Sequence, residues 1–252
     1  MVMKVDLNSD MGEGFGPWRM GDDAALLDVI TSANIACGFH AGDPDVMAET
    51  MRLAAKNGVG IGAHPGFADL KGFGRRRLNI GADELGNMIA YQLGAAEGVA
   101  KSVGAKIRHF KLHGALANMC AEDATLAKTC YSAALRVNPE IILMVLAETA
   151  QQAVVQELGA NWAGEIFADR AYEDDATLVD RSKAGAVLHD ADMAAERILD
   201  MLREDAIIAE GGKRIPAKID TICLHGDTPE AVEMARALRT KLSAAGVTLT
   251  QF

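Results

Sequence analysis

Short apolar runs alternate with amphipathic segments along almost the whole chain. Runs of this length, each bounded by glycine or polar residues, are typical of buried β-strands. They predict seven strands, at residues 5–10, 32–39, 59–65, 108–114, 141–147, 162–170 and 221–227. Apolar residues at helical spacing lie between most of these runs. The pattern therefore predicts that strands and helices alternate.

Several of the predicted helices carry recognisable end signals. Asp43 is a favourable N-cap residue, Pro44 suits the first helical position, and Gly58 follows the last residue at helical spacing. Residues 123–137 carry apolar side chains at the same spacing, and residues 228–230 repeat the start signal before the last helix.

Regular alternation of strand and helix indicates right-handed βαβ units and a parallel sheet. The length of 252 residues is close to the roughly 250 that are usual for a (β/α) barrel. Seven strands instead of eight predict a distorted (β/α)7 TIM-like barrel, formed as a single domain over residues 1–252. An open doubly wound sheet is the alternative, but no G-x-G-x-x-G follows the first strand and the sequence has no Walker lysine.

Composition narrows the class of protein. Half of the residues are hydrophobic, which is enough for a large core, and the net charge of −10 disfavours binding to nucleic acid or to an anionic membrane. Asp6, Asn8 and Asp10 stand where a signal peptide would need its apolar segment, so we expect a cytoplasmic protein without a membrane span. The four cysteines are scattered and are expected to be reduced core residues.

Sorting each predicted strand into its two faces separates the ionisable residues from the apolar ones. Successive side chains of a strand point to opposite faces. In the first strand Asp6, Asn8 and Asp10 share the face opposite Val5 and Leu7. In the later strands the same face carries His40, His64, His109, Lys111, His113, Glu165, Asp169, His225 and Asp227. The apolar faces of barrel strands pack against the helices, so these polar side chains should meet in the lumen, mostly at its C-terminal mouth.

A single histidine at a strand end is usually a hydrogen-bonded structural residue. Ionisable residues from six strands on one side are harder to explain in that way, because burying so many costs several kcal/mol unless they are paired or solvated in a cleft. The pattern therefore predicts an active site at the mouth. Histidines beside carboxylates suit general acid and base catalysis, and a lysine there can stabilise an oxyanion or bind a phosphate.

Three further features leave alternatives open. Asp10, His40 and His64 could bind a metal ion that activates water, although no H-x-x-x-H or H-E-x-x-H motif fixes their spacing. The glycine-rich segment 10–16 is either an anion-binding loop or a tight turn, and Glu13 within it is a candidate for water activation. The basic run 74–77 is either a solvated surface or a site for a phosphate or carboxylate. No G-x-S-x-G motif supports a serine nucleophile.

Taken together, six motifs in order resemble the LamB/YcsF family over nearly the whole chain: "VDLNSDMGEGFG", "SANIACGFHAGDP", "GAHPGFADLKGFGRR", "KLHGAL", "FADRAY" and "LHGD". The sequence departs from the family pattern at Leu112, where proline is expected, and at Ala117, where tyrosine is expected. The resemblance implies a distorted barrel related to the polysaccharide deacetylase and glycoside hydrolase barrels. It also implies ATP-dependent opening of 5-oxoproline to glutamate together with two partner subunits, PxpB and PxpC.

The resemblance also suggests roles for the predicted site residues. Asp10 or Glu13, with His40 or His64, would orient and deprotonate water. Lys111, Arg75 and Arg76 would bind the oxyanion or phosphate, and His113, Asp169 or His225 would protonate the leaving nitrogen. The sequence contains no recognised ATP loop, so ATP is expected either on a partner or at a site of another kind in this barrel.

Two other classes of function stay open. One is a stand-alone metal-dependent amide hydrolase or deacetylase, which would lose activity with a chelator. The other is a non-catalytic protein that binds the lactam for its partners. A bound divalent metal ion and a homo-oligomeric state are both left open by the sequence.

Overall fold

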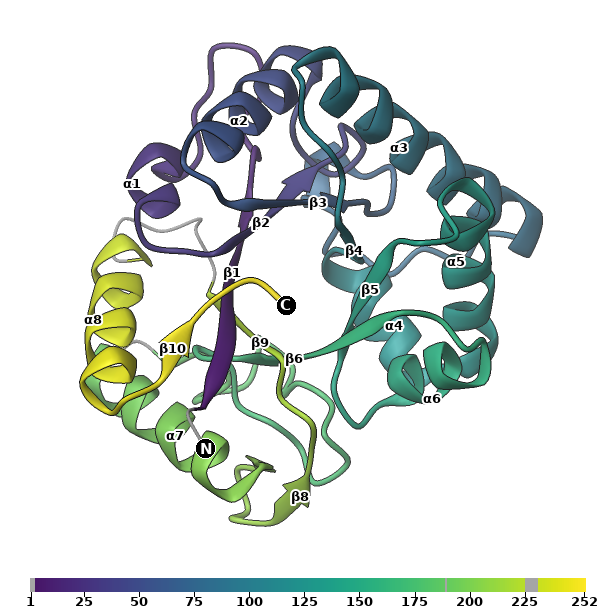
Figure 1. The fold of residues 1–252 in the computed structure, drawn as a ribbon. Helices are drawn as coiled ribbons and strands as arrows, with labels where there is room; N and C mark the ends of the chain where they lie inside the picture. The colour runs from purple at the N-terminus through teal and green to yellow at the C-terminus, as the bar shows by residue number, and fades with distance from the viewer. Residues whose placement is uncertain (1–2, 189, 225–230) are drawn as a thin grey trace.

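Seven parallel strands close into a barrel in this computed structural model, which describes residues 3–188, 190–224 and 231–252. The barrel strands are β1 (Lys4–Met11), β2 (Ser32–Ala36), β3 (Gly60–His64), β4 (His109–Lys111), β5 (Ile142–Leu146), β6 (Trp162–Phe167) and β9 (Thr221–Leu224). β9 pairs with both β6 and β1, which closes the barrel (Figure 1). The predicted seven-stranded barrel is therefore confirmed.

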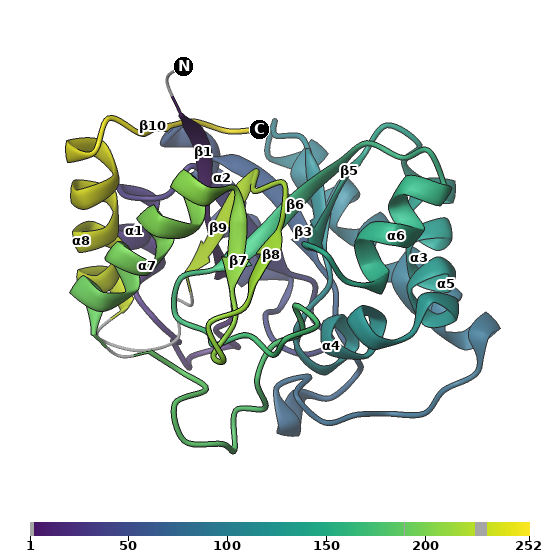
Figure 2. The same ribbon diagram turned by 90° about the horizontal axis from the view of Figure 1, so that it is seen from below.

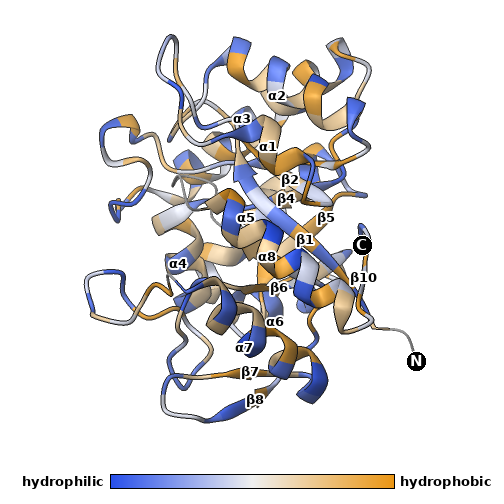
Figure 3. Cartoon of the chain, turned by 90° about the vertical axis from the view of Figure 1, so that its left-hand side faces the viewer, coloured by the Kyte–Doolittle hydropathy of each residue, from blue (hydrophilic) through white to orange (hydrophobic). Residues whose placement is uncertain are grey.

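Helices surround the barrel on all sides in Figure 1. They are α1 (Asp23–Leu27), α2 (Pro44–Lys56), α3 (Ala82–Ser102), α4 (Gly114–Glu122), α5 (Ala124–Val137), α6 (Ala150–Glu157), α7 (Ala191–Glu204) and α8 (Ala231–Ala244), with a short 3-10 turn η1 (Leu70–Gly72). The stripes of orange and blue along them in Figure 3 reflect one buried and one exposed face. Within the described residues, no helix combines the length and the apolar character needed to cross a membrane.

The predicted helix starts at Asp43 and at residue 123 are confirmed. Asp43 Oδ1 accepts hydrogen bonds from the amides of Asp45 and Val46, both at 2.9 Å, and Asp123 caps α5 in the same way. The start signal at 228–230 and the strand end at 225–227 lie outside the described residues.

Three short strands were not predicted. β7 (Ala206–Ile208) and β8 (Arg214–Pro216) form an antiparallel hairpin beside β9 and α7, visible in Figure 2. β10 (Thr248–Leu249) adds two residues of pairing to the start of β1. Both features lie outside the seven-stranded barrel, so the lumen keeps the predicted arrangement.

The lumen is filled by layers of hydrogen-bonded polar side chains. Near its N-terminal end, Asp6 accepts hydrogen bonds from Thr31, Ser32 and Thr221. In the next layer Asn34 donates to Asn8 at 2.7 Å, and Asn34 Oδ1 accepts from His109 Nε2 at 2.8 Å. All of these side chains except Thr31 are fully buried. Asp10 and Lys111 occupy the next lumen-facing positions along β1 and β4, and they therefore lie at the mouth of the barrel.

The C-terminal tail covers the opposite end of the barrel. The ring of Phe252 lies 5.6 Å from that of His109, between ring centres. Arg108 donates to Gln251 Oε1 at 2.8 Å, and Gln251 Nε2 donates to the carbonyl of Gly58 at 2.6 Å. Figure 2 shows the start of β1 and the C-terminus at this end and the long loops at the other. The barrel is therefore closed at one end and open at the mouth.

Candidate active site

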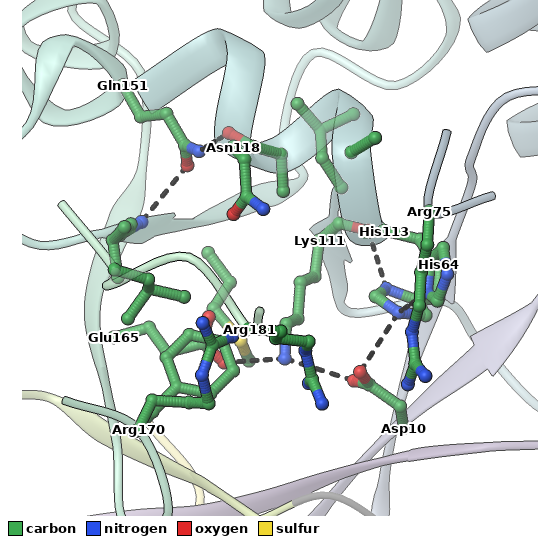
Figure 4. A pocket seen from close by; sticks show the side chains of 18 of the residues that line it. Asp10, His64, Arg75, Lys111, His113, Asn118, Gln151, Glu165, Arg170 and Arg181 are labelled. Carbon is green, nitrogen blue, oxygen red and sulfur yellow. Dashed lines mark hydrogen bonds and ion pairs between the residues drawn. The ribbon is translucent and has the colours of Figure 1, made fainter. Parts of the chain in front are cut away.

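An open cavity of about 390 Å³ lies at the C-terminal ends of the barrel strands (Figure 4). Strand residues form its floor, and its walls are formed by α4 and by the loops that follow β3 and β6. The ionisable residues that line it are Asp10, Glu13, His64, Arg75, Arg77, Lys111, His113, Glu122, Glu165, Arg170, Asp180 and Arg181. The mouth of a (β/α) barrel is where such folds place their active sites, so this cavity is the candidate site.

Lys111 lies at the centre of the cavity floor. Its ammonium is 3.0 Å from Asp10 Oδ1 on β1 and 2.8 Å from Glu165 Oε1 on β6, and Cys223 Sγ lies at 3.0 Å. The ring centre of Phe167 is 5.0 Å away. Three strands thus direct side chains at one buried ammonium, which fixes the positions of both carboxylates.

The charges of this group depend on one another. Burial alone would lower the pKa of Lys111, but Asp10, Cys223 and Glu165 outweigh it and hold that pKa well above its ordinary value. Burial raises the pKa of Glu165, and the attraction of Lys111 offsets only part of this rise. The lysine is therefore a permanent cation at the floor of the cavity.

Beside Lys111, three histidines and a glutamate form a compact cluster, here called the histidine cluster: Glu13, His40, His64 and His113. One nitrogen or carboxylate oxygen of each residue lies within 4.8 Å of those of the other three, and all four side chains are buried. They lie at or just beyond the C-terminal ends of β1, β2, β3 and β4, which are neighbours in the barrel. Parallel pairing therefore brings together residues that are far apart in the sequence.

Hydrogen bonds to backbone carbonyls orient two of the rings. His64 Nδ1 donates to the carbonyl of Lys111 at 2.9 Å, and His113 Nε2 donates to the carbonyl of Phe73 at 2.8 Å. The ring of His40 stacks on that of His113 with centres 3.6 Å apart and planes 7° apart. Burial is the main cause that lowers the pKa of His40 far below its ordinary value and that of His113 to about 3. These two imidazoles are therefore neutral bases at pH 7.

Two glycines make room for the stacked rings. A β-carbon at Gly74 would lie 2.7 Å from His40 Cβ and 2.8 Å from His113 Cδ2, and the residue has a φ of +63°. A β-carbon at Gly66 would lie 2.8 Å from His40 Nδ1. Both glycines come from the loop after β3, so this loop folds closely over the histidine cluster.

Arginines give the wall of the cavity a positive character. Arg75 lines it and lies 4.9 Å from the ring centre of Phe73, while Arg77 pairs with Glu122. Arg170 is buried, donates to the carbonyls of Val179 and Ala186, and has its pKa lowered by burial to about 10. Arg181 is the fourth arginine that lines the cavity. Such a wall suits a carboxylate or phosphate ligand.

Arg76, predicted beside Arg75 as an anion ligand, does not line the cavity. Its guanidinium pairs with Asp69, and 63% of its side chain is exposed. Because Asp69 also accepts a hydrogen bond from the amide of Gly72, the pair stabilises the turn at η1. The structure therefore brings only the first residue of the predicted pair to the cavity.

The glycine-rich segment 10–16 folds as a turn held by carboxylates. The amide of Gly12 donates to Asp23 Oδ2 at 2.9 Å, and that of Gly16 donates to Asp43 Oδ2 at 2.6 Å. Phe15 and Trp18 form an isolated antiparallel bridge across it. Two of the amides that an anion would need are thus already used, which favours the tight-turn interpretation of this segment.

Six of the predicted site residues meet at the mouth: Asp10, Glu13, His40, His64, Lys111 and His113. The predicted metal triad of Asp10, His40 and His64 is not brought together as a set: His40 and His64 cluster with Glu13 and His113. Asp10 lies outside this cluster, with its Oδ2 3.2 Å from His64 Nε2. Asp169 is buried beside Arg170 and is not among the residues lining the cavity. His225 lies outside the described residues.

Three residues that line the cavity were not predicted from the sequence as site residues: Glu165, Arg170 and Arg181. The sequence assigns Glu165 to the lumen face but not to the site, and Arg170 directly follows Asp169 in the "FADRAY" motif. Arg181 comes from the long segment between β6 and α7. Glu165 could have been found from its register, since it shares the lumen face with Lys111.

Comparison with known proteins identifies the family. The model of the LamB/YcsF family matches residues 5–252. The chain belongs to the LamB/YcsF family. Among its relatives, a protein of Ruegeria pomeroyi that is named as a 5-oxoprolinase subunit is 64% identical over 251 residues, covering 100% of this chain and 99% of the relative.

Solved structures agree with this family assignment. The lactam utilization protein from Thermus thermophilus superposes with a TM-score of 0.93 at 39% identity, covering 99% of this chain and 100% of that one. The family 4 carbohydrate esterase from Streptomyces lividans superposes with a TM-score of 0.53 at 10% identity, covering 98% and 91% of the two chains. The second likeness concerns the fold alone: the two chains share a barrel of the same general architecture.

Proposed function

We propose that this chain is the PxpA component of a 5-oxoprolinase, which opens the lactam ring of 5-oxoproline to glutamate and hydrolyses ATP to ADP and phosphate. The observation that carries the proposal is the cavity at the barrel mouth, where an arginine-rich wall faces buried histidines and carboxylates. The name of the 64%-identical relative supports the same activity.

The chemistry explains why ATP is needed. An unstrained lactam is a weak electrophile, and transfer of the γ-phosphoryl group to its carbonyl oxygen would activate the ring carbon while ADP leaves. Water then adds to that carbon, the carbon–nitrogen bond breaks, and the nitrogen takes up a proton. The resulting acyl phosphate reacts with a second water, which releases phosphate and glutamate.

The described residues supply the groups for these steps. Asp10 is held by Lys111 through Oδ1, and its Oδ2 lies 3.2 Å from His64 Nε2, an arrangement suited to orienting a water and accepting its proton. Lys111 and Arg75 would stabilise the oxyanion or the phosphoryl group. Asp10, having taken up the proton of the water, would return it to the ring nitrogen.

We propose that a partner protein binds the nucleotide. No phosphate-binding loop occurs among the described residues, and two amides of the glycine-rich turn are already bonded to carboxylates. The cavity then receives the lactam, while ATP approaches from the partner at the open mouth. PxpB and PxpC are the proposed partners, and the cytoplasm, which supplies ATP, is the proposed location.

The direct test is glutamate release from 5-oxoproline, measured with and without ATP, by this chain alone and together with PxpB and PxpC. Release that requires ATP and all three proteins supports the proposal. If Lys111→Met leaves the rate of glutamate release by the complex unchanged, the chemistry takes place outside this chain. The chain would then have a binding role only.

The histidine cluster favours one other function, a stand-alone metal-dependent amide hydrolase or deacetylase. In that case the isolated chain would open a lactam or remove an acetyl group without ATP, and a chelator would stop the reaction. The same assay, run on the chain alone, separates the two functions.

A further inference from the structure

When both rings are neutral, the nitrogens of His64 and His113 that face each other are both hydrogen-bond acceptors. A backbone carbonyl can only accept, so the bonds to the carbonyls of Lys111 and Phe73 place the ring hydrogens on His64 Nδ1 and His113 Nε2. The remaining nitrogens, His64 Nε2 and His113 Nδ1, lie 3.0 Å apart. Two lone pairs at this distance repel one another unless a cation lies beside them.

The surroundings of this pair add negative charge and further donor atoms for a cation. Asp10 Oδ2 lies 3.2 Å from His64 Nε2, and Glu13 Oε1 lies 3.8 Å from His113 Nδ1. His40 Nε2 lies 3.7 Å from the same Glu13 oxygen. Neither nitrogen of the buried His40 ring has a hydrogen-bond partner in the described structure. One donor atom from each of Glu13, His40, His64 and His113 lies within 4.8 Å of those of the other three.

We propose that the histidine cluster binds one divalent transition-metal ion of the Zn²⁺ class through His64, His113, Glu13 and His40. Bonds of about 2.0–2.1 Å from a metal to imidazole nitrogens separate two such nitrogens by about 2.8–3.0 Å at a right angle and by up to about 3.4 Å at the tetrahedral angle. The separation of 3.0 Å between His64 and His113 falls in this range. Imidazole ligands with one carboxylate suit zinc, iron, cobalt and nickel better than magnesium or calcium.

The hydrogen bonds to the carbonyls have the form that metal-binding histidines usually show. Ligating imidazoles commonly donate their other ring N–H to a carbonyl or carboxylate, which fixes the tautomer and the ring orientation. His40 is the ligand that must move, because its ring is parallel to that of His113 and their in-plane lone pairs do not meet. A tilt of the His40 ring would bring its nitrogen to the ion.

Such an ion would add a Lewis acid to the proposed reaction. It would lie beside His64 and Asp10, where the proposed function places the attacking water. The role in lactam opening rests on the proposed function, but binding of the ion does not.

The test is calorimetric titration of the full chain with Zn²⁺, after EDTA treatment and removal of the chelator. We expect one ion per chain with a Kd on the order of micromolar or lower. Repeating the titration with Co²⁺ gives a visible spectrum that reports nitrogen ligands.

Variants assign the site. His64→Ala and His113→Ala should weaken binding at least about a hundredfold, and the isosteric Glu13→Gln at least about tenfold. His109→Gln is the matched control, because His109 is equally buried in the same barrel but lies outside the cluster, and it should bind as the wild type does. Thermal melting shows which variants fold. If the two histidine variants do not fold, Glu13→Gln still tests the metal site.

Three results would overturn the metal site. The first is no stoichiometric binding of Zn²⁺ to the wild type, and the second is binding that Glu13→Gln and the histidine variants leave unchanged. The third is nitrogen NMR that shows His64 protonated on both nitrogens in the presence of excess Zn²⁺. The titration uses no substrate, nucleotide or partner, so its failure leaves the proposed function standing. Conversely, a complex that binds the ion but releases no glutamate would refute the proposed function and leave the metal site standing.

Discussion

The ammonium of Lys111 and the carboxylate of Glu165 lie 2.8 Å apart inside the barrel, with only 5% and 4% of their side chains exposed. They belong to β4 and β6, which are separated by β5, so the contact crosses part of the lumen. Asp10 approaches the same ammonium from β1. One lysine therefore balances two carboxylates, the buried Glu165 and the partly buried Asp10, from the two strands that flank β9.

Replacing this lysine should affect both turnover and stability. Lys111→Met leaves Glu165 and Asp10 without their cation, and breaking a buried ion pair from one side costs about 3–5 kcal/mol of unfolding free energy. Glutamate release by the complex should fall at least about tenfold, since about 1.4 kcal/mol of lost transition-state stabilisation suffices for that. Urea unfolding and the release assay measure the two effects.

A double variant separates the two roles. In Lys111→Met with Glu165→Gln one of the unpaired charges is gone, so part of the stability should return while turnover stays low. Recovery of turnover along with stability would show that the lysine acts only on the fold.

Gly62 should be irreplaceable by alanine. A β-carbon there would overlap the ring of His109, and this ring is confined by its bond to Asn34. Overpacking of this kind costs about 1–3 kcal/mol or more. Gly98→Ala is the control, because a β-carbon at this position of α3 meets nothing within 4 Å and should stabilise the helix by about 0.5–1 kcal/mol. Equal melting temperatures for the two variants would contradict the packing described.

His109 should make the protein less stable in mild acid. Burial lowers its pKa to about 3 from the ordinary value of 6.5, so between these values the unfolded chain binds a proton that the folded chain does not. The contribution of His109 to the free energy of unfolding is therefore fully present above pH 6.5. It is lost as the pH falls, by up to about 1.4 kcal/mol per pH unit. In His109→Gln, urea unfolding between pH 6.5 and 4.5 should show a slope shallower by that amount. An unchanged slope would mean that His109 is protonated in the folded protein.

The neighbouring arginines Arg75 and Arg76 should differ in their effect on activity. Arg75→Gln removes a cation from the cavity wall and should lower kcat/KM for 5-oxoproline or ATP at least about tenfold. Arg76→Gln removes an exposed guanidinium that pairs with the buried Asp69 outside the cavity, and it should leave kcat/KM within about twofold. If the two variants lose activity equally, the anion does not bind at this wall.

Periodicity in the sequence was enough to predict the barrel and which side chains face its lumen. The strict alternation in β1, for example, assigned Asp6, Asn8 and Asp10 to one face, and parallel pairing then decided which strand ends meet. It could not predict the pairing of Lys111 with both Asp10 and Glu165, because the stagger of non-adjacent strands depends on the tilt of the barrel.

The arginine wall was less predictable. Arg170 and Arg181 lie in a segment between β6 and α7 with no regular period, whose path is set by hydrogen bonds such as that from Arg170 to the carbonyl of Val179. The separation of Arg75 from Arg76 likewise depends on the turn at Asp69. Loop courses of this kind are set by tertiary contacts, which a single sequence does not display.

The tail that seals the far end of the barrel bears on how the protein can be handled. Because the start of β1 and the C-terminal tail lie away from the mouth (Figure 2), an affinity tag or a fused domain joined ahead of β1 would project from the sealed side. A tag appended to Phe252 would disturb the ring that covers His109 and the bonds of Gln251. Immobilisation through the N-terminal side should therefore present the open side, undisturbed, to whatever docks there.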